Sequence, residues 1–127
     1  MQVSVQIPVE AEAVAIARDL AVGAVVEATS TDRRIDDLRL LTSEIVSNAL
    51  LHAGLRPGDS VALAVDASPD RVRVEVADPG PGFDQDALEE PRPGQISGFG
   101  LFIVKQVADR WGVARDTFTR VWFELSL

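Results

Sequence analysis

Two alternating apolar runs joined by a short turn constrain the fold most. Residues 60–66 place Val, Leu and Val at every second position, and residues 71–77 do the same with three valines. Ser68-Pro69-Asp70 between them is a turn sequence. A period of two is that of a β-strand, and two such runs on either side of a turn form a hairpin. The sequence therefore predicts an antiparallel sheet built around this hairpin.

Further alternating runs extend the predicted sheet at both ends of the chain. Residues 2–8 alternate Val, Val and Ile with polar neighbours, and residues 121–127 alternate Val, Phe, Leu and Leu. The segment 113–117 is the expected partner of the last strand. An Arg-Pro-Gly-Asp turn at 56–59 precedes the central hairpin.

Three segments have apolar residues at helical spacing. The first predicted helix covers residues 10–27, and the second covers about 33–52, with N-cap chemistry before it at 29–32 and Gly54 as its stop. The third opens at 98–100 and ends at Gly112. The apolar stripes of these three helices are Val14, Ala17, Ala21 and Val25; Leu38, Leu41, Ile45, Ala49 and Leu50; and Leu101, Val104, Ala108 and Trp111.

The stretch between the hairpin and the third helix has a different composition. Residues 78–97 hold four prolines and three glycines in 20 residues, with little periodicity. The helix that follows is too short to fold alone, so this stretch is expected to be a mobile loop within one domain. The prediction is a single domain over residues 1–127, with helices packed on a largely antiparallel sheet: an α+β two-layer sandwich.

Composition excludes several classes of function. A net charge of −8 gives no broad attraction for nucleic acid or anionic lipid. Cysteine is absent and His52 is the single histidine, which excludes thiolate sites and polyhistidine metal sites. Lys105 is the only lysine, so a Walker A loop is excluded. The chain shows no signal peptide and no apolar run long enough to span a membrane, which favours the cytoplasm.

The second predicted helix carries polar side chains along one face. Glu44, Asn48 and His52 are spaced i, i+4 and i+8, so they lie close together. A carboxylate there can accept a proton from a nucleophile, and an asparagine oxygen can bind a hard cation without adding charge. Taken alone, this pattern is more typical of a solvated polar stripe.

Two glycine-containing stretches flank the loop. At its start, Asp78 can accept a hydrogen bond from an exocyclic amine, while Gly80 and Gly82 let the backbone pass close to a flat ring. At its end, Gly98 and Gly100 expose amides along the dipole of the following helix, which suits an anion. Alone, the first stretch is more typical of a plain Asp-Pro-Gly turn, and the alternative for the second is a flexible entry from a loop into a helix. A Rossmann site is excluded because the third glycine and the β-α-β context are missing.

The order of these motifs is more specific than any one of them. A helix with Glu44 and Asn48, a hairpin, Asp-x-Gly-x-Gly, a pliable loop and Gly-x-Gly-Leu on a helix resemble the GHKL superfamily of gyrase, chaperone, histidine-kinase and mismatch-repair ATPases. The resemblance covers residues 38–127. The compact length and the segments 108–112 and 121–125 are most similar to the stand-alone anti-sigma-factor serine/threonine kinases.

The resemblance implies a role for each motif. Asn48 would coordinate Mg²⁺, Glu44 would act as the base toward an attacking hydroxyl, and Asp78 would bind the adenine amine of ATP. Residues 84–97 would form an ATP lid, short enough to leave the phosphates open to a protein substrate. The residues expected to shape the pocket and hold the phosphates are Gly80, Gly82, Gly98, Phe99, Gly100 and Leu101.

Some residues depart from the pattern of that branch. Gln95-Ile96-Ser97 stands where relatives can carry a basic residue, which leaves Arg92 as the one basic residue of the lid and the candidate cation for the γ-phosphate. Many relatives place a threonine in the last hairpin that supports the adenine aspartate; here Thr117 or Thr119 would replace it, or the contact would be lost. His52 is expected to pack or to end its helix. Both tryptophans, at 111 and 122, are expected in the core or an interface.

Two functions from different classes remain. The first is an ATP-dependent kinase that phosphorylates an antagonist protein on serine or threonine and sequesters a sigma factor. The second is a non-catalytic, ATP-gated binding module, which the lack of a basic residue at 95–97 favours. A histidine-kinase catalytic domain fits poorly, because the phospho-accepting helical hairpin is missing. No direct nucleic-acid or membrane partner is expected. The identity of the partner and a homodimer remain open.

Overall fold

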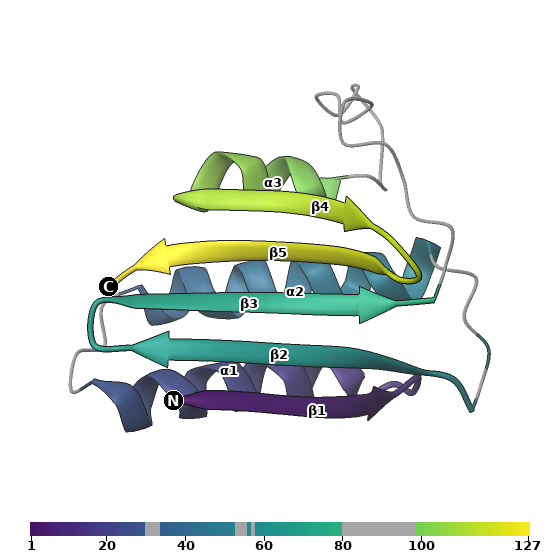
Figure 1. Cartoon of the computed structure of the whole chain (residues 1–127), viewed down its shortest axis with the longest axis horizontal. Coiled ribbons are helices and arrows are strands. Elements are labelled where there is room, and N and C mark those ends of the chain that lie inside the picture. The colour runs from purple at the N-terminus through teal and green to yellow at the C-terminus, as the bar shows by residue number, and fades with distance from the viewer. Residues whose placement is uncertain (30–33, 53–55, 57, 80–98) are drawn as a thin grey trace.

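A computed structural model of the chain describes residues 1–29, 34–52, 56, 58–79 and 99–127. Within these residues, three helices and five strands follow one another in an α+β arrangement (Figure 1). In chain order they are β1 (Gln2–Pro8), α1 (Ala13–Ala28), α2 (Ile35–His52), β2 (Ser60–Ser68), β3 (Arg71–Asp78), α3 (Phe99–Val107), β4 (Arg110–Arg115) and β5 (Thr119–Ser126).

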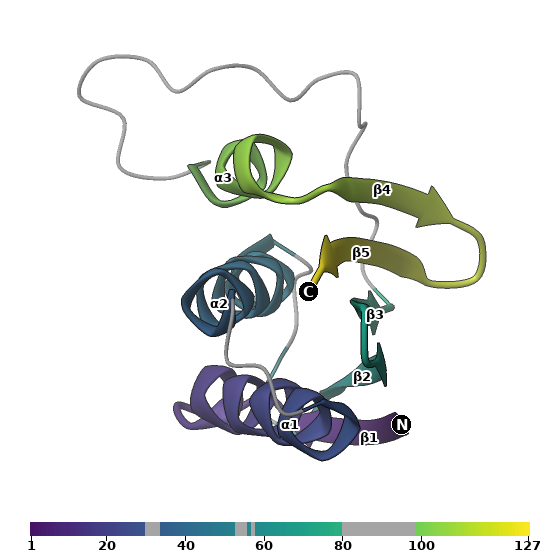
Figure 2. The ribbon, with the colours of Figure 1, turned by 90° about the vertical axis from the view of Figure 1, so that its left-hand side faces the viewer.

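The five strands form one sheet in the order β1-β2-β3-β5-β4, and every neighbouring pair is antiparallel. The predicted central hairpin is confirmed, with Leu63 opposite Val76 and Val65 opposite Val74. All three helices lie on the same face of the sheet, so the molecule has two layers (Figure 2). The predicted two-layer α+β class is therefore correct.

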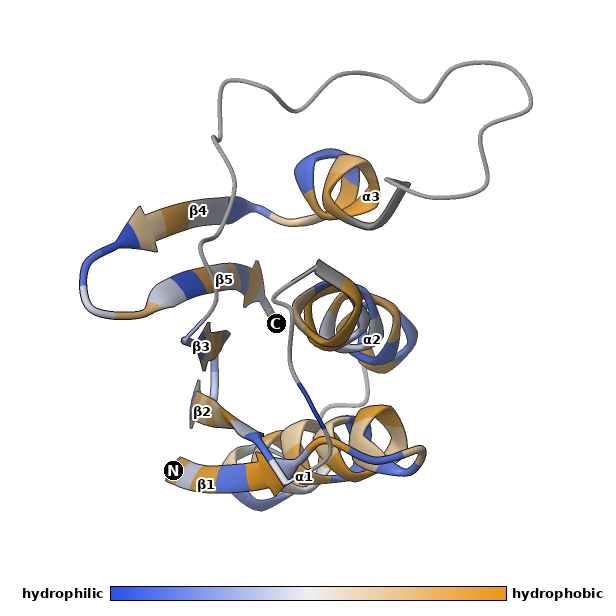
Figure 3. Cartoon of the chain, turned by 90° about the vertical axis from the view of Figure 1, so that its right-hand side faces the viewer, coloured by the Kyte–Doolittle hydropathy of each residue, from blue (hydrophilic) through white to orange (hydrophobic). Residues whose placement is uncertain are grey.

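The core lies between the sheet and the helices. Alternation along each strand turns one set of side chains toward the helices, and the buried residues of α1 and α2 pack against them. Figure 3 shows apolar residues recurring along these helices and along the strands. Burying each large aliphatic side chain of this kind contributes roughly 1.5–3 kcal/mol relative to leaving it exposed. The largest fully buried side chains include Ile7, Leu38, Leu41, Ile45, Leu63, Phe123 and Leu125.

The faces of the first two helices agree with the predicted stripes except at their margins. In α1, Ala17, Ala21 and Val25 are fully buried, whereas Val14 is only half-buried. Small alanines on this face let the helix approach both α2 and the sheet closely, because they add little side-chain bulk. None of the helices in the described ranges is long and apolar enough to cross a membrane.

The third helix is shorter than predicted, and the next strand begins earlier. The prediction that the helix reaches Trp111 and stops at Gly112 is wrong, because α3 ends at Val107 and both residues belong to β4. The physical reason is pairing with β5, where Trp111 lies opposite Phe123 and Gly112 opposite Trp122. Strand pairing across the sheet outweighs the local helical spacing. The partner strand predicted at 113–117 therefore lies at Arg110–Arg115.

Several predicted features fall outside the described residues. These are the lid over residues 84–97, the glycines at 80, 82 and 98, Arg92, the helix stop at Gly54 and most of the N-cap segment at 29–32.

Candidate functional site

The middle of α2 presents the two polar residues of the first motif. Glu44 and Asn48 are both half-buried, one helical turn apart, and lie beside the buried residues Ile45 and Ala49. The helix packs against α1 and α3 and lies across β3 and β5. Partial burial removes water from the Glu44 carboxylate and raises its pKa above the ordinary value. Glu44 is therefore a stronger proton acceptor than an exposed glutamate.

The end of β3 places a buried carboxylate opposite a buried hydroxyl. Asp78 is 4% exposed and Thr119 is 3% exposed, and they face each other in the β3–β5 ladder. Thr117, the other threonine considered for this role, is exposed in the turn before β5. The structure therefore favours Thr119 as the residue that supports Asp78. Because Asp78 continues the inward set of β3, it lies on the helix-covered side of the sheet.

The start of α3 supplies the third part of the site. Phe99 and Gly100 form its first turn, and Leu101 is 4% exposed, anchoring that turn to the core. A buried anchor at this place fixes the direction of the first-turn amides, which carry the positive end of the helix dipole. Because α3 packs against α2, the structure brings together the helices that carry the first and third motifs.

Asn48 is the residue of this site that could contribute an oxygen to a metal ion. Within residues 1–29, 34–52, 58–79 and 99–127, no three His, Cys, Asp or Glu side chains gather in a way that could hold a metal ion. Mg²⁺ is commonly bound by one or two protein oxygens together with substrate phosphates and water. The Asn48 amide oxygen suits such a partial ligand set.

A hollow of about 500 Å³ lies on the opposite, uncovered face of the sheet. Its lining includes Ala62, Ala77, Pro79, Phe118 and Arg120. Pro79 follows Asp78 in the sequence, and Phe118 precedes Thr119. Because successive side chains of a strand point to opposite faces, the hollow and the candidate site lie on opposite sides of the sheet. This hollow contains none of the three motifs except Pro79, so its size does not make it the candidate site.

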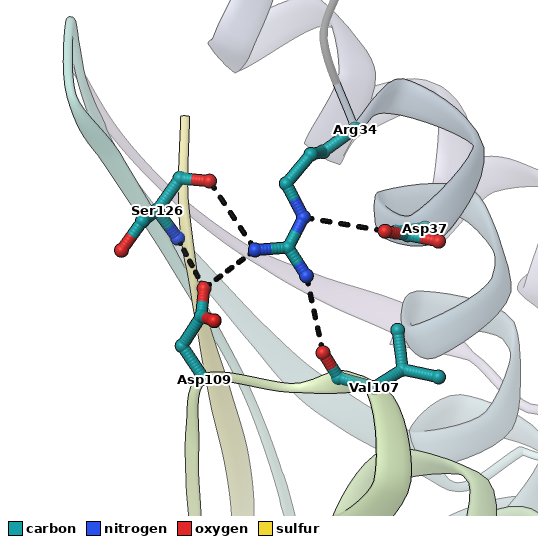
Figure 4. A network of polar contacts seen from close by, with 5 residues as sticks. All are labelled: Arg34, Asp37, Val107, Asp109 and Ser126. Atoms are coloured by element: carbon teal, nitrogen blue, oxygen red, sulfur yellow. Dashed lines mark hydrogen bonds and ion pairs between the residues drawn. The ribbon is translucent and has the colours of Figure 1, made fainter.

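Sequence reasoning missed a polar cluster at the other end of the helices. The Arg34 guanidinium, just before α2, contacts Asp37, Asp109 and the carbonyl oxygens of Val107 and Ser126 (Figure 4). Its partners beyond α2 lie 73 to 92 positions away along the chain, so no local sequence pattern indicates these contacts.

A helix layer on one face of a five-stranded antiparallel sheet, with Asp78 on the side covered by α2, is the arrangement found in ATPase domains of the GHKL type. Residues 7–125 match the family of histidine kinase-like ATPase domains. The chain belongs to this family.

Individual relatives have modest identity. The chain is 27% identical over 120 residues to the serine-protein kinase RsbW of Listeria monocytogenes, and 26% identical to that of Listeria innocua. Each alignment covers 85% of this chain and 76% of the relative.

Solved structures share the fold. A crystal structure of RsbU and RsbW domains from Mycobacterium tuberculosis matches with a TM-score of 0.69 at 17% identity, covering 98% of this chain and 31% of that one. The histidine kinase domain of an Erythrobacter litoralis blue-light activated histidine kinase matches with a TM-score of 0.59 at 23% identity, covering 94% of this chain and 61% of that one. The chain thus spans less than two thirds of either solved chain.

Proposed function

We propose that the chain binds ATP with Mg²⁺ between α2, the end of β3 and the start of α3, and that it is an anti-sigma factor with serine/threonine kinase activity toward an antagonist protein. One observation carries the proposal: Asp78 is buried opposite Thr119 on the side of the sheet covered by the helix that bears Glu44 and Asn48. Membership of the ATPase family and the names of the Listeria relatives support it.

Adenine would be recognised by Asp78. An ionised carboxylate has about four acceptor positions, so it can accept a bond from the exocyclic amine beside its contacts within the protein. Its burial excludes competing water and strengthens that bond. The neighbouring Thr119 hydroxyl can donate to Asp78 or to the ligand, which would hold the carboxylate in one orientation.

The phosphates would lie between Asn48 and the first turn of α3. The amides of that turn favour an anion, and the Asn48 oxygen would complete the shell of a Mg²⁺ ion carried by the phosphates. Gly98 and Arg92 are proposed to contact the phosphates as well, and residues 84–97 are proposed to form the lid. In a protein of net charge −8, such local contacts must replace any general attraction for ATP.

Glu44 would serve as the base. A serine or threonine hydroxyl of the antagonist would attack the γ-phosphorus, its proton would pass to the Glu44 carboxylate, and the bond from phosphorus to the β-γ bridging oxygen would break to release ADP. The raised pKa of Glu44 brings its basicity closer to that needed at neutral pH. Positioning and charge neutralisation supply the rest of the rate.

The test is phosphate transfer from labelled ATP to candidate antagonist proteins encoded in the same operon. Glu44→Gln should leave ATP binding nearly intact and lower transfer by roughly 100-fold or more. Glu27→Gln removes an exposed glutamate from α1 and should transfer like the wild type. Arg92→Ala should slow transfer while ATP still binds.

Each alternative has its own result in that experiment. Equal transfer by Glu44→Gln and the wild type would show that Glu44 is only part of a polar helix face. A wild-type protein that binds ATP and its partner tightly yet never phosphorylates the partner would be a binding module.

A further inference from the structure

Arg34 joins α2, α3, β5 and the connection between α3 and β4 at one point of the fold. Its Nε donates to Asp37 at 3.2 Å, in the first turn of α2. One terminal nitrogen donates to Asp109 at 2.6 Å and to the Ser126 carbonyl at 3.4 Å, and the other donates to the Val107 carbonyl at 3.1 Å. Asp109 also accepts the Ser126 amide at 2.6 Å. We call these five residues the Arg34 clamp (Figure 4).

The backbone of Arg34 shows that this arrangement is maintained against a conformational cost. Its φ is 64°, in the left-handed region, and among the described non-glycine residues it alone has a positive φ. A non-glycine residue keeps this backbone conformation where the surrounding contacts hold it in place. The Arg34 side chain is only 28% exposed, and its guanidinium makes four directed contacts that hold the residue in this conformation.

The clamp lies at the opposite end of the helix pair from the candidate ATP site. Helices α2 and α3 run in opposite directions (Figure 1), so the start of α2 and the end of α3 meet at Arg34. Asn48 lies near the end of α2, and the first turn of α3 lies at that same far end. With nine residues, α3 spans about 13 Å, and a short helix moves as a rigid rod.

Apolar contacts alone would leave α3 free to slide or turn. Leu101 and Val104 hold it to the core, but hydrophobic attraction has no direction. Hydrogen bonds weaken steeply as they bend or stretch, so the bond to the Val107 carbonyl fixes the helix along its own axis. A cation at the C-terminal end of α3 also complements the helix dipole.

We propose that Arg34 is a positioning residue for phosphate binding: it holds α3 against α2 so that the first-turn amides of α3 and the oxygen of Asn48 face the same phosphates. The inference rests on the proposed function, because it assigns Arg34 to the ATP site described there. In this role Arg34 touches no ligand and acts through the placement of α3. Displacements of about 1 Å at such sites can change rates or affinities by up to roughly 100-fold.

The test compares nucleotides with and without phosphates. Arg34→Gly removes the side chain, and glycine adopts the positive φ without cost. Its effect therefore measures the loss of the clamp contacts and not added backbone strain. ATP and ADP affinities are measured by calorimetry with Mg²⁺, and adenosine binding by NMR titration, at a temperature where every variant is folded. The expected result is a loss of about tenfold for ATP and ADP, with adenosine changed less than about twofold.

Two further variants sharpen the comparison. Arg34→Lys keeps the charge but lacks the fork that serves several acceptors at once, so its ATP affinity should fall between those of the wild type and Arg34→Gly. Arg39→Ala removes an exposed arginine from α2 and should bind all three ligands like the wild type.

The outcomes separate this inference from the proposed function. Wild-type ATP affinity retained in Arg34→Gly would overturn the positioning role and leave the proposed function standing. Equal losses for ATP and adenosine would show that Arg34 only stabilises the fold, which also overturns the role. A wild-type protein that binds no ATP at all would remove the proposed function itself.

Discussion

Most polar and charged side chains that the structure describes are at least partly exposed, and a few are buried. Thr42, Asp78, Thr119 and Glu124 are the buried polar or charged residues in these ranges. Asp78 and Thr119 face each other at the candidate adenine site, and Glu124 accepts a salt bridge from Arg73 at 3.1 Å. Burial of a polar group costs free energy unless it is compensated, so each case requires either a partner or a function.

Thr42 is buried without a compensating hydrogen bond among the described residues. Its side chain is fully buried on α2, and its hydroxyl has no hydrogen-bond partner among the described residues. Thr42→Val keeps the shape and removes the unsatisfied hydroxyl. We predict that it raises the free energy of unfolding by about 1 kcal/mol, measured by urea denaturation. The control Thr117→Val changes an exposed threonine and should leave stability unchanged. A destabilised Thr42→Val protein would mean that the hydroxyl has a partner.

The raised pKa of Glu44 predicts a pH-dependent stability. Because burial disfavours the ionised form, Glu44 stabilises the fold while protonated, and this contribution is lost as pH rises through its folded-state pKa. Glu44→Gln should therefore be more stable than the wild type at neutral pH. The difference should shrink as pH falls below the ordinary glutamate value, where the wild-type residue is also neutral.

Denaturation curves at several pH values measure this difference. Glu27→Gln, exposed on α1, reports what removing one negative charge does to so acidic a chain. A stability difference for Glu44→Gln that stays constant across pH, or that matches this control, would contradict the assigned burial effect.

Among the elements, the boundary between α3 and β4 shows what the sequence could and could not predict. The β1 strand and the β2–β3 hairpin were predictable because their alternation is local and continuous. The end of α3 was not, because it depends on the β4–β5 ladder and on Arg34, which is 73 positions from Val107. Asp78 and Asn48 could be proposed from their motifs, whereas choosing Thr119 over Thr117 required the strand register.

Gly112 in β4 is required by a close side-chain contact. A Cβ atom there would lie 2.7 Å from Nε1 of Trp122, whose ring also has the Arg73 guanidinium carbon 4.0 Å from its centroid. Gly112→Ala would force the ring to move and disturb its cation–π contact. We predict destabilisation by about 1–3 kcal/mol, the usual range for overpacking, together with a change in tryptophan fluorescence.

The matched control for that change is Ala114→Val. Ala114 lies two positions further along β4, on the same face of the sheet, and is exposed. It should tolerate the larger side chain with little loss of stability. If Gly112→Ala is as stable as the wild type and its fluorescence is unchanged, the Trp122 ring does not lie over Gly112.

At the scale of the whole molecule, the two-layer arrangement puts the candidate ATP site and the Arg34 clamp at opposite ends of the same helix pair. None of the three described helices lies over the other face of the sheet (Figure 2). It carries Arg73, Arg110 and Arg120, each in a salt bridge with a glutamate, in a protein whose net charge is −8. The proposed phosphate binding therefore falls to the covered side, where the first-turn amides of α3 and a cation held by Asn48 would supply it.

Calorimetric titration of ATP with Mg²⁺ tests whether the chain binds this nucleotide through Asp78. We predict saturable binding to the wild type and a loss of roughly 5- to 150-fold in Asp78→Asn, about 1–3 kcal/mol, because the acceptor for the adenine amine is weakened. Asp66→Asn changes an exposed aspartate on β2 and should bind ATP like the wild type. Absence of ATP binding to the folded wild-type protein with Mg²⁺ present, or unchanged affinity in a folded Asp78→Asn protein, would contradict the account.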